Sequence, residues 1–185
     1  MIGVQDLRKG TTYVEDGELW RVLEYAHIKA GRGNATIRVK VRNLRTGATT
    51  EKTYPSGSRV QDVRLDHATV QYLYHDGDLY YFMNTETYEQ PALSASVLGD
   101  AVNYLTDGLT LELESYEGEP ITVELPTTVD LKVVETGPAF AGDTATNATK
   151  PAVLSTGLQV NVPLFVEVGD VIRVDTRTGT YVTRV

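Results

Sequence analysis

Arginine and lysine gather in one stretch of this 185-residue sequence, and their side chains are suited to holding phosphate. Between Arg21 and Arg45 there are seven basic residues and a single acid. Within this stretch, Arg32 lies between Gly31 and Gly33. A guanidinium group is a fixed positive charge whose planar fork matches phosphate oxygens, and the flanking glycines permit close approach of the backbone to a partner. The chemistry that these residues offer is therefore the binding of a phosphate-rich partner.

Two extended segments, 19–26 and 36–43, flank this glycine-bordered arginine and are expected to position it. The second segment alternates between apolar and basic residues, which is the period of a half-buried strand. We therefore predict a hairpin with the arginine and its two glycines at the tip. An extended arm of this length would carry the Arg32 guanidinium roughly 26 Å from Glu24. An ordinary surface hairpin with a solvated tip is the alternative that the spacing leaves open. The alternating residues are Ile37, Val39 and Val41 on one face and Arg38, Lys40 and Arg42 on the other.

No group of residues has the types and spacing of a catalytic or metal centre. The three histidines do not cluster at the spacing of metal ligands. There is no cysteine, which excludes disulfides and thiolate sites and fits a reducing cytosol. The segment from Gly31 to Gly33 is half of a dinucleotide-binding fingerprint, but no helix is expected after it. The sequence also lacks a Walker phosphate loop and a Gly-x-Ser-x-Gly elbow. We therefore predict a protein that is not an enzyme and that uses neither a cofactor nor a metal.

The first residues and the apolar runs predict a cytoplasmic protein. The N-terminus has no basic stretch followed by an apolar run, so we expect no secretory signal. No run approaches 18 apolar residues, so we expect no membrane span and no membrane partner. We predict a monomer in the cytoplasm.

The formal net charge of −8 conceals an uneven distribution along the chain. Residues 1–63 carry 11 basic and 7 acidic residues, a net charge of +4. Residues 64–127 carry 1 basic and 12 acidic residues (−11), and residues 128–185 carry 5 and 6 (−1). Only the first third is suited to holding a polyanion by itself. The middle third would repel a polyanion and would instead suit a basic protein surface.

Many short strands separated by turn residues predict an all-β protein made of three small barrels. We place the barrels at residues 1–63, 64–127 and 128–185. Regular spacing of strands and turns favours barrels over an α/β arrangement.

Aromatic residues and one apolar periodicity give expectations for the interior. We expect Trp20 to anchor the core of the first barrel rather than to offer a stacking platform. We likewise expect the six tyrosines between residues 72 and 104 to pack in the core or at its rim. Only residues 94–105 have helical periodicity, with Ser94 as the candidate N-cap.

Two blocks of residues resemble the bacterial elongation factor P family, and the resemblance extends over essentially the whole chain. The first block is Asp6-Leu7-Arg8-Lys9-Gly10 followed by Gly31-Arg32-Gly33-Asn34-Ala35, which resembles the first domain and the tip loop of that family. The second block lies in the C-terminal third, matches the family signature almost throughout, and is the more specific. It contains Lys150-Pro151-Ala152, Gly157, Val160-Asn161-Val162-Pro163-Leu164-Phe165-Val166, Gly169-Asp170-Val171-Ile172-Arg173-Val174-Asp175-Thr176 and Tyr181.

The resemblance implies a fold and a function. The implied fold is a KOW-type barrel, related to Src-homology-3 barrels, followed by two OB-fold barrels in an L-shaped arrangement like the limbs of a transfer RNA. The implied function is that of a translation elongation factor that binds the 70S ribosome between the P and E sites. Such a factor positions the P-site peptidyl-tRNA, stimulates peptide-bond formation and relieves stalling at consecutive prolines. The expected partners are the ribosome with its RNA and the peptidyl-tRNA.

The resemblance also assigns roles to individual residues. Many members of the family carry a modified lysine at the tip, and this chain has Arg32 instead. Arg32 is therefore the expected position of any modification, for example rhamnosylation by an arginine-modifying glycosyltransferase. The expected P-site tRNA contacts are Lys29, Gly31, Arg32 and Gly33; the expected phosphate contacts are Arg38, Lys40 and Arg42; and Gly142, Asp143 and Thr144, which match the Gly-Asp-Thr of the family, would lie near the E-site codon.

Two other functions are compatible with the same sequence. One is an elongation factor P-like paralogue with the same ribosome site and a different client. The other is a stand-alone KOW or OB RNA-binding protein. The first differs in which stalled sequences respond, and the second in whether binding needs an assembled ribosome or only naked RNA.

Overall fold

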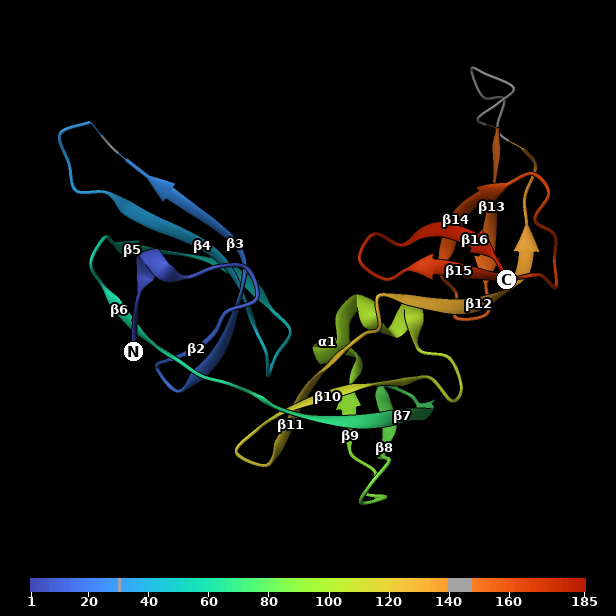
Figure 1. Cartoon of the computed structure of the whole chain (residues 1–185), viewed down its shortest axis with the longest axis horizontal. Helices are drawn as coiled ribbons and strands as arrows, with labels where there is room; N and C mark the ends of the chain where they lie inside the picture. Colours follow the sequence, from blue (N-terminus) through green and yellow to red (C-terminus); the bar gives the residue numbers. More distant parts are fainter. Residues whose placement is uncertain (30, 140–147) are drawn as a thin grey trace. The chain divides into compact units, whose positions relative to one another are not determined.

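Backbone pairing arranges the chain into three sheets (Figure 1). This computed structural model describes residues 1–29, 31–139 and 148–185. Strands dominate, and the helical segments are short. The predicted all-β class with barrel-like sheets is therefore confirmed.

Contacts divide the chain into two compact units. The first unit consists of Met1–Ala68, Leu93–Gly99 and Leu113–Thr122. The second unit consists of Thr69–Ala92, Asp100–Glu112 and Val123–Val185. The placement of three barrels with boundaries after residues 63 and 127 stays a prediction.

The first sheet contains the predicted hairpin. β3 (Glu18–Ile28) and β4 (Thr36–Asn43) pair antiparallel, from Trp20 opposite Asn43 to Ile28 opposite Thr36. The sheet has the order β1-β6-β2-β3-β4-β5. Its remaining elements are β1 (Ile2–Gly3), the 3-10 helix η1 (Val4–Asp6), β2 (Thr12–Glu15), β5 (Thr49–Pro55) and β6 (Arg59–Asp62).

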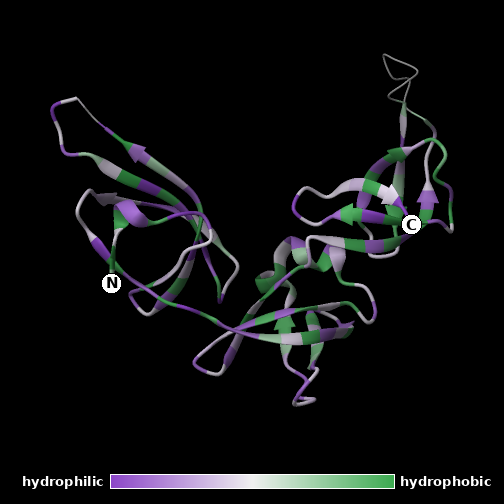
Figure 2. Cartoon of the chain, viewed as in Figure 1, coloured by the Kyte–Doolittle hydropathy of each residue, from purple (hydrophilic) through white to green (hydrophobic). Residues whose placement is uncertain are grey.

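β4 alternates between core and surface, as its sequence predicts. Ile37, Val39 and Val41 are each 0% exposed, whereas Arg38 is exposed and Lys40 is half-buried. Figure 2 shows the corresponding change between hydrophobic and hydrophilic residues along the strand. β4 is paired with β3 on one side and with β5 on the other, so both of its edges are hydrogen-bonded, and its apolar face packs in the core cluster of this sheet.

Two aromatic residues, Trp20 and Tyr13, lie at the core of this sheet. Trp20 packs against the core, as predicted, and the Nζ atom of Lys52 lies 4.1 Å from the centre of its ring. Tyr13 is fully buried, and its hydroxyl is 3.0 Å from the hydroxyl of Tyr54. The buried members of the cluster are Val4, Leu7, Tyr13, Val22, Ile37, Val39, Val41 and Val60.

The second sheet has the order β11-β10-β7-β8-β9, and the predicted helical segment lies between its strands β9 and β10 in the sequence. α1 (Ala95–Leu98) begins after Ser94, whose side chain accepts a hydrogen bond from the Val97 amide at 3.4 Å. The predicted N-cap is therefore confirmed, and η2 (Gly99–Tyr104) continues the segment. The strands are β7 (Asp66–Asp76), β8 (Leu79–Asn84), β9 (Ala92–Ser94), β10 (Thr110–Tyr116) and β11 (Glu119–Glu124).

The expectation that the tyrosines between residues 72 and 104 lie in the core or at its rim is only partly right. Tyr72 and Tyr104 are buried, but Tyr74 is 52% exposed and Tyr88 is 70% exposed. The pairing of β7 with β8 has a bulge between Tyr72 and Tyr74, which turns Tyr74 outward, where it stacks on Tyr81. A bulge of this kind cannot be read from alternation alone, because it changes the period by one residue.

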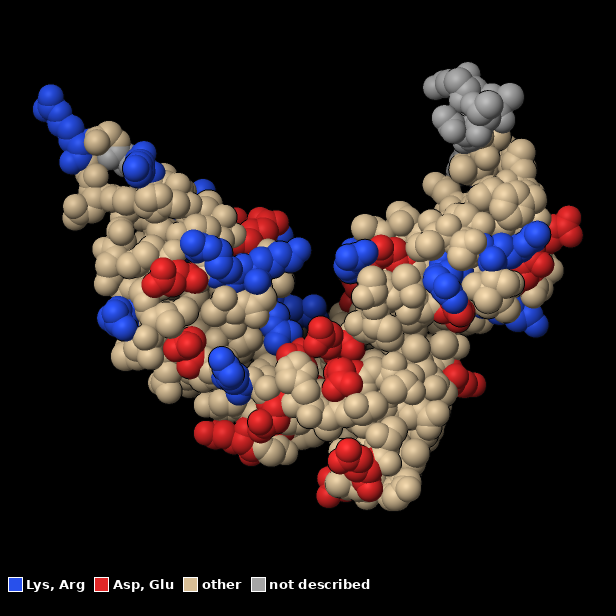
Figure 3. Space-filling model, viewed as in Figure 1, with Lys and Arg blue, Asp and Glu red and all other residues tan. Residues whose placement is uncertain are grey.

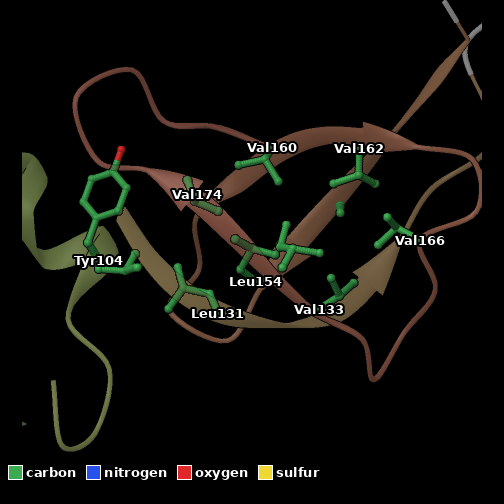
Figure 4. Packing of buried hydrophobic residues seen from close by; sticks show 11 residues of the cluster. Tyr104, Leu131, Val133, Leu154, Val160, Val162, Val166 and Val174 are labelled. Atoms are coloured by element: carbon green, nitrogen blue, oxygen red, sulfur yellow. The ribbon is translucent and has the colours of Figure 1, made fainter. Parts of the chain in front are cut away.

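The third sheet has the order β14-β13-β12-β15-β16 and surrounds a valine-rich core. Tyr104 comes from η2 and lies at one end of this core, beside Val174 and Leu131 (Figure 4). The strands are β12 (Thr128–Thr136), β13 (Thr149–Leu154), β14 (Gln159–Pro163), β15 (Val171–Asp175) and β16 (Thr180–Arg184).

A buried ion pair joins β3 to β10 within the first unit. Arg21 donates from Nη1 to Oε1 of Glu114 at 3.0 Å and from Nη2 to Oε2 at 2.7 Å. The side chain of Glu114 is only 6% exposed. An apolar cluster of Leu19, Leu44 and Ile121 is also part of this unit. The bidentate geometry compensates for the loss of hydration of the two charges.

Two buried tyrosines, Tyr13 and Tyr72, predict a loss of folding stability in alkaline solution. Burial raises the pKa of Tyr13 and of Tyr72 to about 12. The unfolded chain releases tyrosine protons near pH 10. Between about pH 10 and about pH 12 the native state therefore binds more protons than the unfolded state, and the free energy of unfolding falls as the pH rises. Urea denaturation at steps from pH 9 to pH 12 measures this fall. Titration of all 11 tyrosines together near pH 10 in the folded protein, followed by absorbance, would contradict it.

The ion pair predicts a contrast between two glutamates. Removing one partner of a fully buried pair costs about 3 to 5 kcal/mol, and Arg21 keeps 24% of its exposure, so we expect Glu114→Gln to lower the free energy of unfolding by about 2 kcal/mol. Glu119 forms an exposed pair with Arg45 at 3.5 Å, so Glu119→Gln should change it by less than about 0.5 kcal/mol. Urea midpoints of the two variants measure the contrast. Equal losses in the free energy of unfolding would show that the buried pair of Arg21 with Glu114 stabilises the fold no more than the exposed pair of Arg45 with Glu119.

Candidate functional site

The tip of the hairpin, residues 29–35, lies between the end of β3 and the start of β4 and presents two basic side chains. Lys29 and Arg32 are both exposed. Among the described residues, neither side chain has a hydrogen bond or an ion pair. Figure 3 shows basic side chains at the far end of this arm. The two charges are therefore available to a partner.

Gly31 does not owe its place to packing within the chain. A Cβ atom placed on Gly31 would meet no described atom within 4 Å. The fold thus leaves room for a side chain at this position, and the sequence has none. A small residue here leaves that space to a partner, as the sequence predicts for close backbone approach.

The tip is short because its flanking strands are paired almost to its ends. On the β4 side, Thr36 pairs with Pro55, and the Ser56 amide donates to the carbonyl oxygen of Ala35 at 2.9 Å. On the β3 side, pairing continues to Ile28. The long reach predicted from Glu24 is therefore mostly a reach of paired strand, and among the described residues of the tip only Lys29 and residues 31–34 lack such support. A tip of this length is held more closely than a free loop of the whole hairpin would be.

The predicted phosphate contacts Arg38 and Lys40 lie on the outward face of β4, where both line a pocket with the acids Glu24 and Glu51. Arg38 is exposed and stands between Ala26 and Thr53 of the neighbouring strands. Lys40 stands between two acids, Glu24 on β3 and Glu51 on β5. Opposite charges directly across strands attract each other, so these acids reduce the field that Lys40 presents to an outside phosphate.

Arg42, the third predicted phosphate contact, has a partner within the first unit. Its Nη2 atom donates to the carbonyl oxygen of Val97, at the end of α1, at 2.8 Å. A Cβ atom on Gly99 would lie 2.6 Å from the same guanidinium nitrogen. Gly99 therefore makes room for this arginine. Together with Arg21 and Arg45, Arg42 belongs to a basic subset that contacts residues 93–122 of its own chain.

The sequence gives no signal for these internal partners. Glu114 looks like one more member of the acidic middle third, and Val97 contributes only its backbone. A glycine at position 99 with φ of 57° is the one local mark, and it reads equally well as the end of a helix. The division of the basic residues into free and engaged ones therefore had to come from the structure.

The predicted codon-side loop, Gly142, Asp143 and Thr144, lies outside the described residues. In the third sheet, the arginines that the structure describes have acidic neighbours. Arg173 contacts Asp130 at 2.9 Å, Arg177 contacts Asp175 at 2.9 Å, and the pair of Arg184 with Asp170 is longer, at 3.7 Å. These arginine charges are compensated within the chain, whereas Lys29, Arg32 and Arg38 of the hairpin have no such partner among the described residues.

Neither a metal site nor a membrane-spanning helix occurs among the described residues. Among the described residues, no group of three histidine, aspartate or glutamate side chains is placed to hold a metal ion. No helix in the described part of the chain is long and apolar enough to cross a membrane. A pocket lined by Thr12, Arg21, His67 and Glu114, among others, surrounds the buried ion pair. Arg21 and His67 both contact Glu114 there, and Arg21 also donates to Thr12, so these polar groups are already engaged with one another.

Comparison with protein families covers almost the whole chain. The KOW-like domain model of elongation factor P matches residues 3–60, its OB domain model matches residues 65–123, and its C-terminal domain model matches residues 129–184. Curated proteins called elongation factor P are similar over full length. The protein of Thermotoga maritima is 53% identical and that of Moorella thermoacetica is 50% identical, each over 184 residues and 100% of both chains.

A solved structure supports the fold. A eukaryotic translation initiation factor 5A from Methanococcus jannaschii aligns with 67% of this chain and 91% of its own, with a TM-score of 0.52 and 23% sequence identity. At that identity the similarity concerns the fold alone. The family matches and the full-length relatives go further, and they agree with the KOW-like and OB domains implied by the sequence motifs: the chain belongs to the elongation factor P family of translation elongation factors.

Proposed function

We propose that this chain binds the 70S ribosome between the P and E sites and positions the P-site peptidyl-tRNA, so that peptide bonds form at consecutive prolines. One observation carries the proposal above all others. Arg32 is exposed, has no partner among the described residues, and lies at the end of a hairpin whose two strands are paired almost to the tip. Membership of the elongation factor P family supplies the setting in which such an arm acts.

The proposed mechanism adds no catalytic group. Proline reacts slowly because its ring nitrogen and the constrained nascent chain are poorly placed for attack. Holding the end of the peptidyl-tRNA restores a near-attack geometry, and the gain comes from orientation that is fixed in advance. Lys29 and Arg32 would contact phosphate or ribose, and Gly31 and Gly33 would allow the backbone to approach. A paired hairpin suits this task because it resists displacement of the tip.

The other predicted contacts fall into two groups. Arg38 is exposed and unpaired among the described residues, so we propose that it contacts phosphate, with Lys40 as a weaker neighbour between its two acids. The role predicted for Arg42 stays a prediction, and we do not rest the proposal on it, because its guanidinium already donates to Val97. We also propose that Gly142, Asp143 and Thr144 lie near the E-site codon.

Arg32 is also the proposed position of any modification. Its side chain is exposed, and its guanidinium has no partner among the described residues, so a modifying glycosyltransferase would have access to it. Intact mass measurement of the protein from its natural host tests this directly. A mass equal to that of the bare sequence would mean that unmodified arginine performs the task.

Arg32→Ala should abolish most of the stimulation on a triple-proline template. We expect peptide-bond formation at the stall to slow at least tenfold, because the positioned charge is lost. Ribosome binding should weaken less, since Lys29 and Arg38 remain, and thermal stability should change by less than about 0.5 kcal/mol because the residue is exposed. In vitro translation of a triple-proline reporter, with Arg59→Ala as an arginine control away from the tip, measures this. Full activity of Arg32→Ala would refute the mechanism.

Arg32→Lys separates charge from shape. Lysine keeps the positive charge and the reach, but it lacks the planar fork and cannot carry an arginine modification. Partial stimulation on the triple-proline template would indicate that charge and reach contribute by themselves. No stimulation would indicate that the fork or a modification is required.

Equal binding of the unchanged protein to naked RNA and to 70S ribosomes would instead favour the stand-alone RNA-binding protein.

A further inference from the structure

One stretch of β3 leaves the barrel without a strand on its outer side. β2 accompanies β3 only from Glu18 to Arg21, and two further backbone hydrogen bonds extend the contact to Val22. The pairing of β3 with β4 then has a bulge between Val22 and Glu24. Among the described residues, β3 is paired on its β4 side alone from Glu24 to Ile28. An edge stretch that starts at a bulge is where a strand bends most easily.

Tyr25 lies on this exposed edge, packs against the core, and contacts Gln5 and Arg8. The Tyr25 hydroxyl donates to the carbonyl oxygen of Gln5, in η1, at 3.0 Å. Arg8 donates from Nη1 to the same oxygen at 2.8 Å and to the carbonyl oxygen of Leu7 at 2.6 Å. The guanidinium carbon of Arg8 lies 4.8 Å from the centre of the Tyr25 ring. One backbone carbonyl thus accepts from both side chains, while the guanidinium stacks on the ring. We call Arg8, Tyr25 and Gln5 the brace.

We propose that Arg8 and Tyr25 are positioning residues for the tip: through the brace they fix the direction in which β3 leaves the barrel, and so the place of Arg32. This inference rests on the proposed function. The brace takes the place of the missing outer strand, since it ties the edge of β3 to η1 just after the bulge. On the other side of the hairpin, β5 and the bond from Ser56 to Ala35 give the equivalent support to β4.

The length of the arm makes the direction at Tyr25 important. Arg32 lies seven positions after Tyr25 in the sequence, a reach of at most about 23 Å. A tilt of about 5° at Tyr25 would therefore move the tip by up to about 2 Å. A misplacement of about 1 Å is enough to cost on the order of 100-fold in rate where catalysis depends on orientation. A small loss of rigidity at the brace should therefore affect the rate far more than it affects folding or affinity.

The brace is separable from the core. Tyr25 is only partly buried, and its hydroxyl bond to Gln5 is exposed to solvent. Tyr25→Phe keeps the ring and its packing against the core but removes that bond. Arg8→Ala removes the stacking and the two bonds of the guanidinium. A matched control is Arg59→Ala, since Arg59 also donates to a backbone carbonyl, that of Met1 at 2.9 Å, in the same sheet but away from the arm.

A measurement that does not involve the ribosome tests the geometry. Because the chain has no cysteine, Asn34→Cys and Thr49→Cys allow specific spin labelling of the tip and of the start of β5. We expect a narrow distribution of label distances in the otherwise unchanged protein and in Arg59→Ala. The double variant Arg8→Ala with Tyr25→Phe should give a clearly broader or displaced distribution. An unchanged distribution in the double variant would overturn the proposal.

A rate measurement tests the consequence. On a triple-proline template with saturating factor, we expect the double variant to slow peptide-bond formation about tenfold. The factor concentration for half-maximal effect and the melting temperature should stay as in Arg59→Ala. A normal rate of peptide-bond formation in the double variant, despite a broadened distribution of label distances, would overturn the proposal. A loss of rate that weaker ribosome binding accounts for would overturn it as well. If the double variant unfolds, Tyr25→Phe alone is read in the same way. If the unchanged protein gives no stimulation, the proposed function fails, and the spin-label result still decides whether the brace fixes the tip.

Discussion

The first barrel depends on the double-sided pairing of β4. Eight residues of this strand are paired with β3 on one side and seven with β5 on the other, and its apolar face is fully buried. Every second side chain is thereby committed to the core, so a register slip of one residue would expose Ile37, Val39 and Val41 together. The same ladder continues outward to Thr36 and carries the tip. Core stability and tip placement are therefore two consequences of a single strand register.

Opposite charges serve both the fold and the site. The sequence divides into a basic first third and an acidic middle third, which suggests one part for a polyanion and another for a basic protein. Within the first unit, however, Arg21 and Arg45 pair with Glu114 and Glu119, and Arg42 holds the carbonyl oxygen of Val97. Part of the opposite charge thus holds segments of one unit together. The described basic residues of the hairpin that form no ion pair are Lys29, Arg32, Arg38 and Lys40, and of these Lys40 lies between two acids on the neighbouring strands.

The sequence predicts periodic features well and pairwise features poorly. The alternation of residues 36–43, the glycine-bordered tip and the Ser94 cap are local patterns, and each is confirmed by the structure. The bulges after Val22 and Tyr72 each add one residue to a strand, and the sequence has no local pattern that marks them. For this reason the expectation that Tyr74 lies in the core or at its rim was wrong. The ion pair of Arg21 with Glu114 joins residues 93 positions apart, and any of several glutamates could have served as the partner. Such choices are made by the packing of the whole unit and cannot be read from composition.

A small number of free cations has a consequence for how the arm works. Each phosphate contact makes the affinity depend on salt: the logarithm of the binding constant falls with the logarithm of the salt concentration, with a slope of about −0.7 to −0.9 per contact. An arm with few unpaired cations therefore cannot supply strong binding by charge alone. In a chain with a net charge of −8, nonspecific attraction to RNA is opposed as well. Specific placement on the proposed partner must then come mainly from the shape of the protein surface outside the arm. The arm itself contributes the position of its tip. In the proposed mechanism, the rigidity that Arg8 and Tyr25 give to the edge stretch of β3 therefore matters as much as the charge of Arg32. A tip that binds weakly can act on a reaction only if it is already in the right place.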